Sequence, residues 1–169
     1  MTTAYLLIGS NSEDREYQLR RAVALLSSEM EVVSLSSIYE SEAWGFKSEK
    51  DFYNQVVIIR THFSGEKVME ICLKIEKEMG RIRKSQFGYS DRNIDIDILY
   101  FGDRVISSDL LTVPHPRIQE RNFVLVPMTE VAPDLVHPIL HLTQSEMLRQ
   151  LKDQGWIRKV DFDELKGNQ

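Results

Sequence analysis

Two aspartates stand two positions apart in a short apolar segment, NIDIDI at residues 93–98. Successive side chains of a β-strand point to opposite faces, so a strand here puts Asp95 and Asp97 on one face and the isoleucines on the other. Their Cα atoms would lie about 6.6 Å apart, at ~3.3 Å of rise per residue. Carboxylates this close repel unless a cation or a proton joins them. The pair suits Mg²⁺ ions that bridge to phosphates, and the alternative is a half-exposed strand with two solvated acids.

Basic residues precede the acid pair in the sequence: Arg81, Arg83, Lys84 and Arg92. Arginine presents a planar fork of N–H donors that matches phosphate oxygens, so this run suits a polyphosphate. The alternative is that Arg81 and Lys84 neutralise the end of a helix that stops at Gly80. The eight glycines form neither a G-x-x-x-x-G-K-[ST] nor a G-x-G-x-x-G loop. Side chains and metal ions would therefore have to hold any phosphates.

Further candidates lie in or beside predicted loops. His115 stands between two prolines that fix its loop, so it could donate to a phosphate, although a lone loop histidine can also be purely structural. The aromatic residues Phe52, Phe123 and Trp44 could stack on a flat ligand or pack in the core. Their spacing in the sequence does not separate these two roles.

The apolar pattern predicts the elements that position these residues. Residues 4–9, 53–61 and 94–101 are typical of strands, and residues 32–39 alternate loosely. Helical spacing predicts helices over about 14–28 and from Ser64, a capping residue, to about Met79. The order strand, helix, strand, strand, helix, strand indicates an α+β, ferredoxin-like βαββαβ sandwich, with an antiparallel sheet and helices on one face. C-terminal additions include a short helix near residues 145–154.

Composition bounds the class of protein. The chain has 169 residues and a formal net charge of −5, from 21 Lys and Arg against 26 Asp and Glu, which suits one domain over residues 1–169 with a peripheral tail from about 157. Mild acidity disfavours nonspecific nucleic-acid or anionic-membrane partners. The single cysteine, Cys72, excludes an internal disulfide. With no signal-like or membrane-spanning start, we expect a soluble cytoplasmic protein. We also expect it to be a monomer.

Taken together, several segments resemble the 6-hydroxymethyl-7,8-dihydropterin pyrophosphokinases, enzymes of folate synthesis. The resemblance extends from about Ala4 to Leu151 and depends on the order and spacing of modest pieces at residues 5–11, 37–41, 52–56, 75–84, 92–99, 111–116 and 121–123. It implies the ferredoxin-like fold. It also implies ATP-dependent transfer of pyrophosphate to the hydroxymethyl group of 6-hydroxymethyl-7,8-dihydropterin, with release of AMP.

Matched positions imply a role for each site residue. The acid pair Asp95 and Asp97 would hold two Mg²⁺ ions, with ATP as co-substrate. Catalytic roles fall on Arg81, Arg83, Arg92, Asp95 and Asp97. ATP contacts fall on Glu76, Arg81, Arg83, Lys84, Arg92, Ile98, Thr112, His115 and Arg121. Pterin contacts fall on Ser41, Trp44, Phe52, Asn54, Asp95 and Phe123, with Phe52 and Phe123 stacking on the two faces of the ring.

The chain departs from the family pattern at some of these places. Residues 41–45 read SEAWG where the family often has TPPLG, Leu73 replaces a glutamine near the adenine, and Pro116 replaces a tyrosine. Two other functions fit a ferredoxin-like domain: a non-catalytic module that binds nucleotides or single-stranded RNA, and a pterin-binding regulator without chemistry. The acidic net charge and the paired aspartates disfavour the first, because they repel RNA phosphates unless metals intervene. The matched Asp95 and Asp97 disfavour the second. Mg²⁺-dependent consumption of ATP would discriminate.

Overall fold

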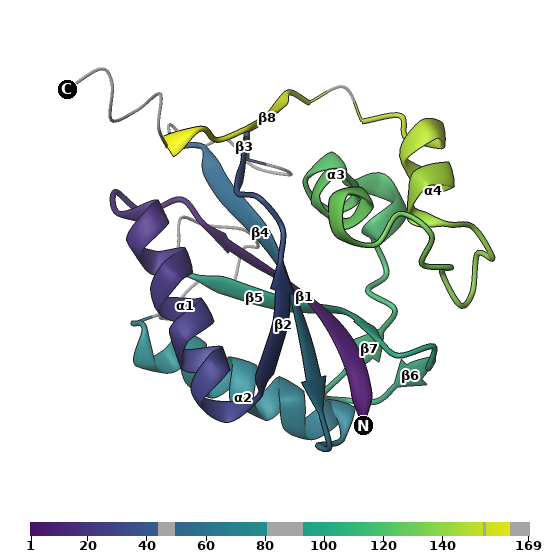
Figure 1. The fold of residues 1–169 in the computed structure, drawn as a ribbon, viewed down its shortest axis with the longest axis horizontal. Coiled ribbons are helices and arrows are strands. Elements are labelled where there is room, and N and C mark those ends of the chain that lie inside the picture. The colour runs from purple at the N-terminus through teal and green to yellow at the C-terminus, as the bar shows by residue number, and fades with distance from the viewer. Residues whose placement is uncertain (44–49, 81–92, 154, 163–169) are drawn as a thin grey trace.

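The computed structural model describes residues 1–43, 50–80, 93–153 and 155–162. Its main sheet is antiparallel, with the order β5-β1-β4-β3-β8 and with β2 also beside β4 (Figure 1). The strands are β1 (Thr2–Ser10), β2 (Glu31–Leu35), β3 (Tyr39–Ser41), β4 (Phe52–Thr61), β5 (Asp95–Phe101) and β8 (Ile157–Lys159). A second, small sheet pairs β6 (Ile106–Ser107) with β7 (Thr112–Val113).

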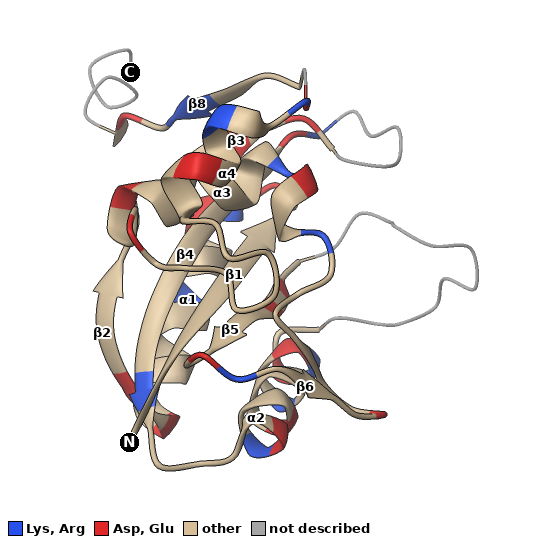
Figure 2. Cartoon of the chain, turned by 90° about the vertical axis from the view of Figure 1, so that its right-hand side faces the viewer, with Lys and Arg blue, Asp and Glu red and all other residues tan. Residues whose placement is uncertain are grey.

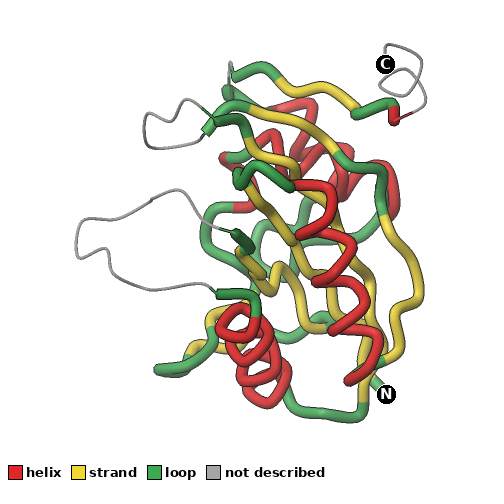
Figure 3. The backbone as a smooth tube through the Cα atoms, turned by 90° about the vertical axis from the view of Figure 1, so that its left-hand side faces the viewer, coloured by secondary structure: helices red, strands yellow, loops and turns green. Residues whose placement is uncertain are grey.

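One face of the main sheet packs against two long helices, α1 (Arg15–Glu29) and α2 (Gly65–Glu78). Figure 3 shows α1 crossing in front of the strands. The Ser64 hydroxyl accepts a hydrogen bond from the Lys67 N–H at 3.2 Å and begins α2. Gly80, at φ +84°, follows the end of α2, because glycine adopts this backbone without a Cβ clash. This arrangement confirms the predicted ferredoxin-like fold.

The C-terminal additions cover the other face of the sheet. They comprise the 3₁₀ turn η1 (Ile118–Glu120) and the helices α3 (Asn122–Val131) and α4 (Gln144–Gln150). Leu7 and Val56 of the sheet pack there with Val124 and Met128. The central strands are therefore buried on both faces, which explains why β1 and β4 read as continuous apolar runs. Charged residues lie mostly on the helices and connections, and β1 carries none (Figure 2).

Some boundaries differ from the sequence predictions. Phe52 begins β4 and Phe123 lies in α3, so neither is a loop residue, and α4 ends at Gln150 rather than near 154. Residues 157–159, in the expected peripheral tail, form edge strand β8 on β3. This pairing joins segments more than a hundred residues apart, beyond the reach of local patterns. Over the described residues, no helix combines the length and the apolar character that crossing a bilayer requires.

Candidate active site

Strand register brings the acid pair and Asn54 to one face of the sheet. Gly9 of β1 pairs with Asn54 of β4 on one side and with Asp95 of β5 on the other. Residues directly opposite each other in neighbouring strands point to the same face. Asp97 lies opposite Leu7, one of the residues that packs against α3 and α4. The two aspartates and Asn54 therefore belong to the face that carries the C-terminal additions.

The Asn54 side chain is held in place on this face. It is buried, and its Nδ2 donates to the Ser41 Oγ at 3.1 Å. Its Oδ1 lies over Gly9, where an added Cβ would come within 2.8 Å of that oxygen. Ser41 in turn pairs with Phe52, so three predicted pterin residues lie together. Gly9 is not among the site residues predicted from the sequence, although a glycine inside an apolar strand is the usual signal of such a close approach.

The acid pair is suited to a metal that arrives with a phosphate ligand. Asp95 and Asp97 are half-buried. No cluster of three or more His, Cys, Asp and Glu suited to a metal occurs in the described part of the chain. Mg²⁺ ordinarily takes one or two carboxylates and completes its octahedron with water and substrate phosphate oxygens. Two carboxylates on one face therefore fit Mg²⁺ bound together with a nucleotide.

His115 lies beside the acid pair as a neutral donor. Its backbone N–H donates to the Leu99 carbonyl at 2.9 Å. The pKa of His115 is lowered to about 4, mainly by burial and then by the charge of Arg121, while Asp95 opposes the shift. The Nδ1 atom accepts a hydrogen bond from the Arg117 N–H at 3.2 Å, which leaves the single proton of the neutral ring on Nε2. That N–H suits a phosphate oxygen.

Arg121 and Phe123 stand at the start of α3. Arg121 is buried, and its guanidinium lies 5.5 Å from the centroid of the Phe123 ring, within the range of a cation–π contact. Phe123 is half-buried and packs against the apolar cluster under α3. Since α3 contacts both β3 and β4, the helix brings Phe123 to the face that carries Asn54.

Three predicted ATP residues contribute in different ways. Glu76 is buried and its Oε1 accepts from the Ile96 N–H at 3.1 Å, which ties α2 to β5. The Ile98 side chain lies in the core on the α2 side, so it can reach a ligand only through its backbone. The Ile96 N–H points away from β1, and the N–H of Ile98, two residues on, faces the same outer edge. Thr112 is exposed in β7.

The remaining predicted residues are Trp44, Arg81, Arg83, Lys84 and Arg92, and they lie outside the described residues. Their contacts with pterin or phosphate stay predictions. Cys72 is buried on α2, and burial is the main cause that raises the pKa of its thiol to about 12. The thiol is therefore protonated at neutral pH and is not a nucleophile there.

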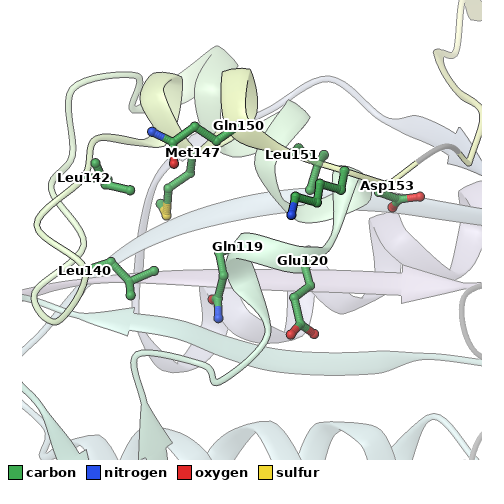
Figure 4. A pocket seen from close by; sticks show the side chains of 9 residues that line it. Gln119, Glu120, Leu140, Leu142, Met147, Gln150, Leu151 and Asp153 are labelled. Atoms are coloured by element: carbon green, nitrogen blue, oxygen red, sulfur yellow. The ribbon is translucent and has the colours of Figure 1, made fainter.

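A pocket of about 420 Å³ lies between η1 and α4 (Figure 4). Its lining combines apolar and charged side chains and consists of Gln119, Glu120, Leu140, Leu142, Met147, Gln150, Leu151, Lys152 and Asp153. None of the predicted site residues lines it. The residues that bear on phosphate and pterin chemistry are instead those of the sheet face and of the start of α3.

The sequence of the chain is similar to those of known proteins, and this similarity identifies its family. A profile of 7,8-dihydro-6-hydroxymethylpterin-pyrophosphokinase (HPPK) matches residues 5–133. The chain belongs to this family. It is 40% identical over 158 residues to the 2-amino-4-hydroxy-6-hydroxymethyldihydropteridine pyrophosphokinase of Aquifex aeolicus. The aligned residues make up 94% of this chain and 95% of that protein. It is 41% identical over 163 residues to the pyrophosphokinase of the same name in Methylorubrum extorquens. There the alignment covers 95% of this chain and 100% of the other protein.

Other relatives are longer than this chain. The folic acid synthesis protein fol1 of Schizosaccharomyces pombe is 39% identical over 165 residues, which are 96% of this chain but 22% of that protein. The crystal structure of an HPPK-DHPS in complex with substrates superposes with a TM-score of 0.70 at 14% identity, covering 88% of this chain and 43% of that one. The superposition supports the fold alone, and this chain corresponds to only a part of both longer proteins.

Proposed function

We propose that the chain transfers the β,γ-pyrophosphoryl group of ATP to the hydroxymethyl oxygen of 6-hydroxymethyl-7,8-dihydropterin and releases AMP. The observation that supports this most is the row of Asn54, Gly9 and Asp95 across β4, β1 and β5. The row sets an amide suited to a pterin edge beside carboxylates suited to metal-bound phosphates. Membership of the HPPK family supports the same reaction.

The pterin would lie between the sheet and α3. Asn54 offers a donor and an acceptor to the amide edge of the ring, and its Nδ2 is already oriented by Ser41. Phe52 begins the strand that carries Asn54, and Phe123 faces the sheet from α3. A flat ring between two aromatic faces is held with its hydroxymethyl arm in one direction, which we place toward Asp95.

The triphosphate would lie over Asp95, Asp97, His115 and Arg121. When bound there, two Mg²⁺ ions held by Asp95 and Asp97 would neutralise charge on the triphosphate. The Nε2–H of His115 donates to a phosphate oxygen without adding a charge of its own, and Arg121 supplies a fixed positive charge. Glu76 keeps the β5 edge fixed to α2, so the Ile98 backbone can meet the adenine there. The predicted contacts of Arg81, Arg83, Lys84 and Arg92 add further cations.

The reaction joins the hydroxymethyl oxygen to the β-phosphorus of ATP. The bond from that phosphorus to the α,β-bridging oxygen breaks, and AMP leaves with the electron pair. The hydroxyl proton goes to Asp97, a phosphate oxygen or water. Such transfers need mainly in-line positioning and charge neutralisation from the protein, and little covalent help. Residues fixed by strand register can meet both needs.

The test is to incubate the chain with Mg-ATP and 6-hydroxymethyl-7,8-dihydropterin and to identify both products by chromatography and mass spectrometry. We expect AMP in equal amount to a pterin that has gained two phosphate units, and no AMP when the pterin is omitted. Stoichiometric ADP, or turnover that does not depend on the pterin, would contradict the proposal.

We also propose, as the sequence leads us to expect, that the protein acts on small molecules as a monomer in the cytoplasm. Sedimentation at the enzyme concentration of the assay should then give one species of about 20 kDa, in line with the 19.7 kDa chain. A dimer whose dissociation abolishes activity would contradict the monomer.

A further inference from the structure

The C-terminal end of the described chain touches both walls of the proposed pterin site. We call Asp153, Gly155 and β8 the C-terminal strap. The strap lies beyond residue 133, where the family match ends. Figure 1 shows the chain running from α4 past α3 to β8, which lies beside β3.

On the sheet side, the strap holds the strand that carries Ser41. In the antiparallel pairing of β8 with β3, Ser41 lies opposite Ile157 and Glu40 lies opposite Arg158. The Arg158 Nε and Nη2 atoms donate to the Glu40 Oε1 at 3.1 and 2.9 Å. Ser41 is the residue whose Oγ accepts from the Asn54 amide. The strap therefore reaches the pterin-facing amide through one intermediate residue.

On the helix side, the strap caps α3. The Arg121 side chain makes no capping hydrogen bond at the start of this helix. Instead, the Asp153 Oδ2 accepts from the Asn122 N–H at 3.2 Å, and the Gly155 carbonyl accepts from the Asn122 Nδ2 at 2.7 Å. The Asp153 Oδ1 accepts from the Gly155 N–H at 2.8 Å. A carboxylate here satisfies an otherwise open N–H and complements the positive end of the helix dipole.

We infer that the C-terminal strap sets the separation between the sheet wall and the α3 wall of the pterin site, with Asp153 as its positioning residue. The inference rests on the proposed pterin site. Asp153 bonds to Asn122 and so fixes the position of the first turn of α3. Phe123 follows Asn122 in that turn, so Asp153 positions the aromatic ring. Arg121 depends less on the strap, since its own N–H bonds to the Ile118 carbonyl of η1 at 3.4 Å.

The experiment compares Asp153→Ala with Asp134→Ala, which removes the same charge from an exposed aspartate just beyond the other end of α3. Calorimetry measures the Kd of 6-hydroxymethyl-7,8-dihydropterin in the presence of a nonhydrolysable Mg-ATP analogue, and the Kd of the analogue alone. We expect Asp153→Ala to raise the pterin Kd about 5- to 30-fold, the range of one or two lost stabilising contacts. The analogue Kd should change less than about twofold, and Asp134→Ala should leave both constants unchanged.

A double-mutant cycle separates positioning from general destabilisation. If Asp153 acts through the ring of Phe123, Asp153→Ala should add little to the pterin Kd of the Phe123→Ala variant. Additive losses, equal losses for pterin and analogue, or an unchanged pterin Kd would each overturn the inference. If Asp153→Ala fails to fold by circular dichroism, Asn122→Ala removes the bond to Gly155 and is held to the same criteria.

The wild-type titration keeps this inference apart from the proposed function. Wild-type protein that binds the analogue but not the pterin would contradict the function and the role of the strap together. Wild-type protein that binds both ligands, with an Asp153→Ala variant that binds the pterin equally well, would overturn the strap alone.

Discussion

The sheet and the C-terminal additions supply the two halves of the proposed site by different means. Asn54, Asp95 and Asp97 come from adjacent hydrogen-bonded strands, where register fixes each position through many backbone bonds. His115 and Phe123 come from the loop before η1 and from the start of α3, which a few side-chain and loop contacts hold, such as the bond from the His115 N–H to the Leu99 carbonyl. A substitution in the sheet should therefore remove one chemical group, whereas a substitution in the additions should also move its neighbours.

The largest effect should come from the acid pair. Asp95→Ala and Asp97→Ala should each lower kcat at least ~10²-fold, the lower end of the cost of one preorganised charge-stabilising group. Thermal stability should hold or rise slightly, because each change relieves repulsion between two carboxylates. Rate assays and thermal melts test this, with Asp103→Ala in the exposed turn after β5 as the matched control. Near-wild-type rates at saturating Mg²⁺ would contradict the ligand role.

The next effect concerns selectivity between the two substrates. Phe123→Ala should weaken pterin binding about tenfold, because a stacked aromatic pair contributes roughly 0.5–1.5 kcal/mol beyond the area that it buries. Asn54→Ala should weaken it by a similar factor, because hydrogen bonds of about 1 kcal/mol each to the amide edge are lost. Nucleotide binding should weaken much less in both variants. Separate titrations with pterin and Mg-ATP measure this, and Phe63→Ala, an exposed ring beyond β4, is the control. Equal losses for both ligands in Phe123→Ala would mean that the ring only packs against the core.

A smaller effect should follow from a methyl group at Gly9. Its Cβ would lie 2.8 Å from the Asn54 Oδ1, so the amide must turn. We expect the KM for pterin to rise about fivefold, equivalent to ~1 kcal/mol, with the KM for ATP unchanged. Gly65→Ala is the control, because its Cβ would crowd the Leu111 side chain at 2.7 Å and affect stability alone. An unchanged pterin KM in Gly9→Ala would show that the close approach has no functional consequence.

The smallest effect is a pH dependence of stability. The pKa of His115 is about 4 in the folded chain, against 6.5 for an unperturbed histidine. At a pH between these two pKa values, the unfolded chain binds more protons than the folded chain. The free energy of unfolding therefore falls as the pH drops from 6.5 toward 4. Wild type should lose roughly 1 kcal/mol more than His115→Gln between pH 7 and pH 5, a value reduced for the partial exposure of the ring. Urea unfolding measures it, and parallel losses in both proteins would contradict the neutral buried imidazole.

Local patterns in the sequence were sufficient for the acid pair of the sheet half, whereas Asn54 and Ser41 were predicted only from the family resemblance. The alternation around Asp95 and Asp97 predicted their shared face, and the Ser64 and Gly80 signals bounded α2. These features depend on neighbours within a few residues, which is the distance over which periodicity and capping act. The order of elements then fixed the ferredoxin-like topology, because short connections leave few alternatives.

The C-terminal half could not be predicted in the same way. The Arg158–Glu40 contact joins residues 118 positions apart, and Asp153 caps a helix that begins 31 positions earlier in the sequence. Nothing in either local segment marks these partners. The neutral state of His115 likewise depends on burial and on Arg121, which only the folded chain brings together. These features of the C-terminal half depend on contacts between residues far apart in the sequence, which periodicity does not predict.

The most direct test of pyrophosphoryl transfer follows the β-phosphorus of ATP. With ATP labelled with ³²P at the β-position, Mg²⁺ and 6-hydroxymethyl-7,8-dihydropterin, the label should move to the pterin in a one-to-one ratio with unlabelled AMP. Asp95→Ala should slow this transfer in proportion to its loss of kcat. Label that remains in ADP, while the pterin gains a single phosphate or none, would contradict the proposed reaction.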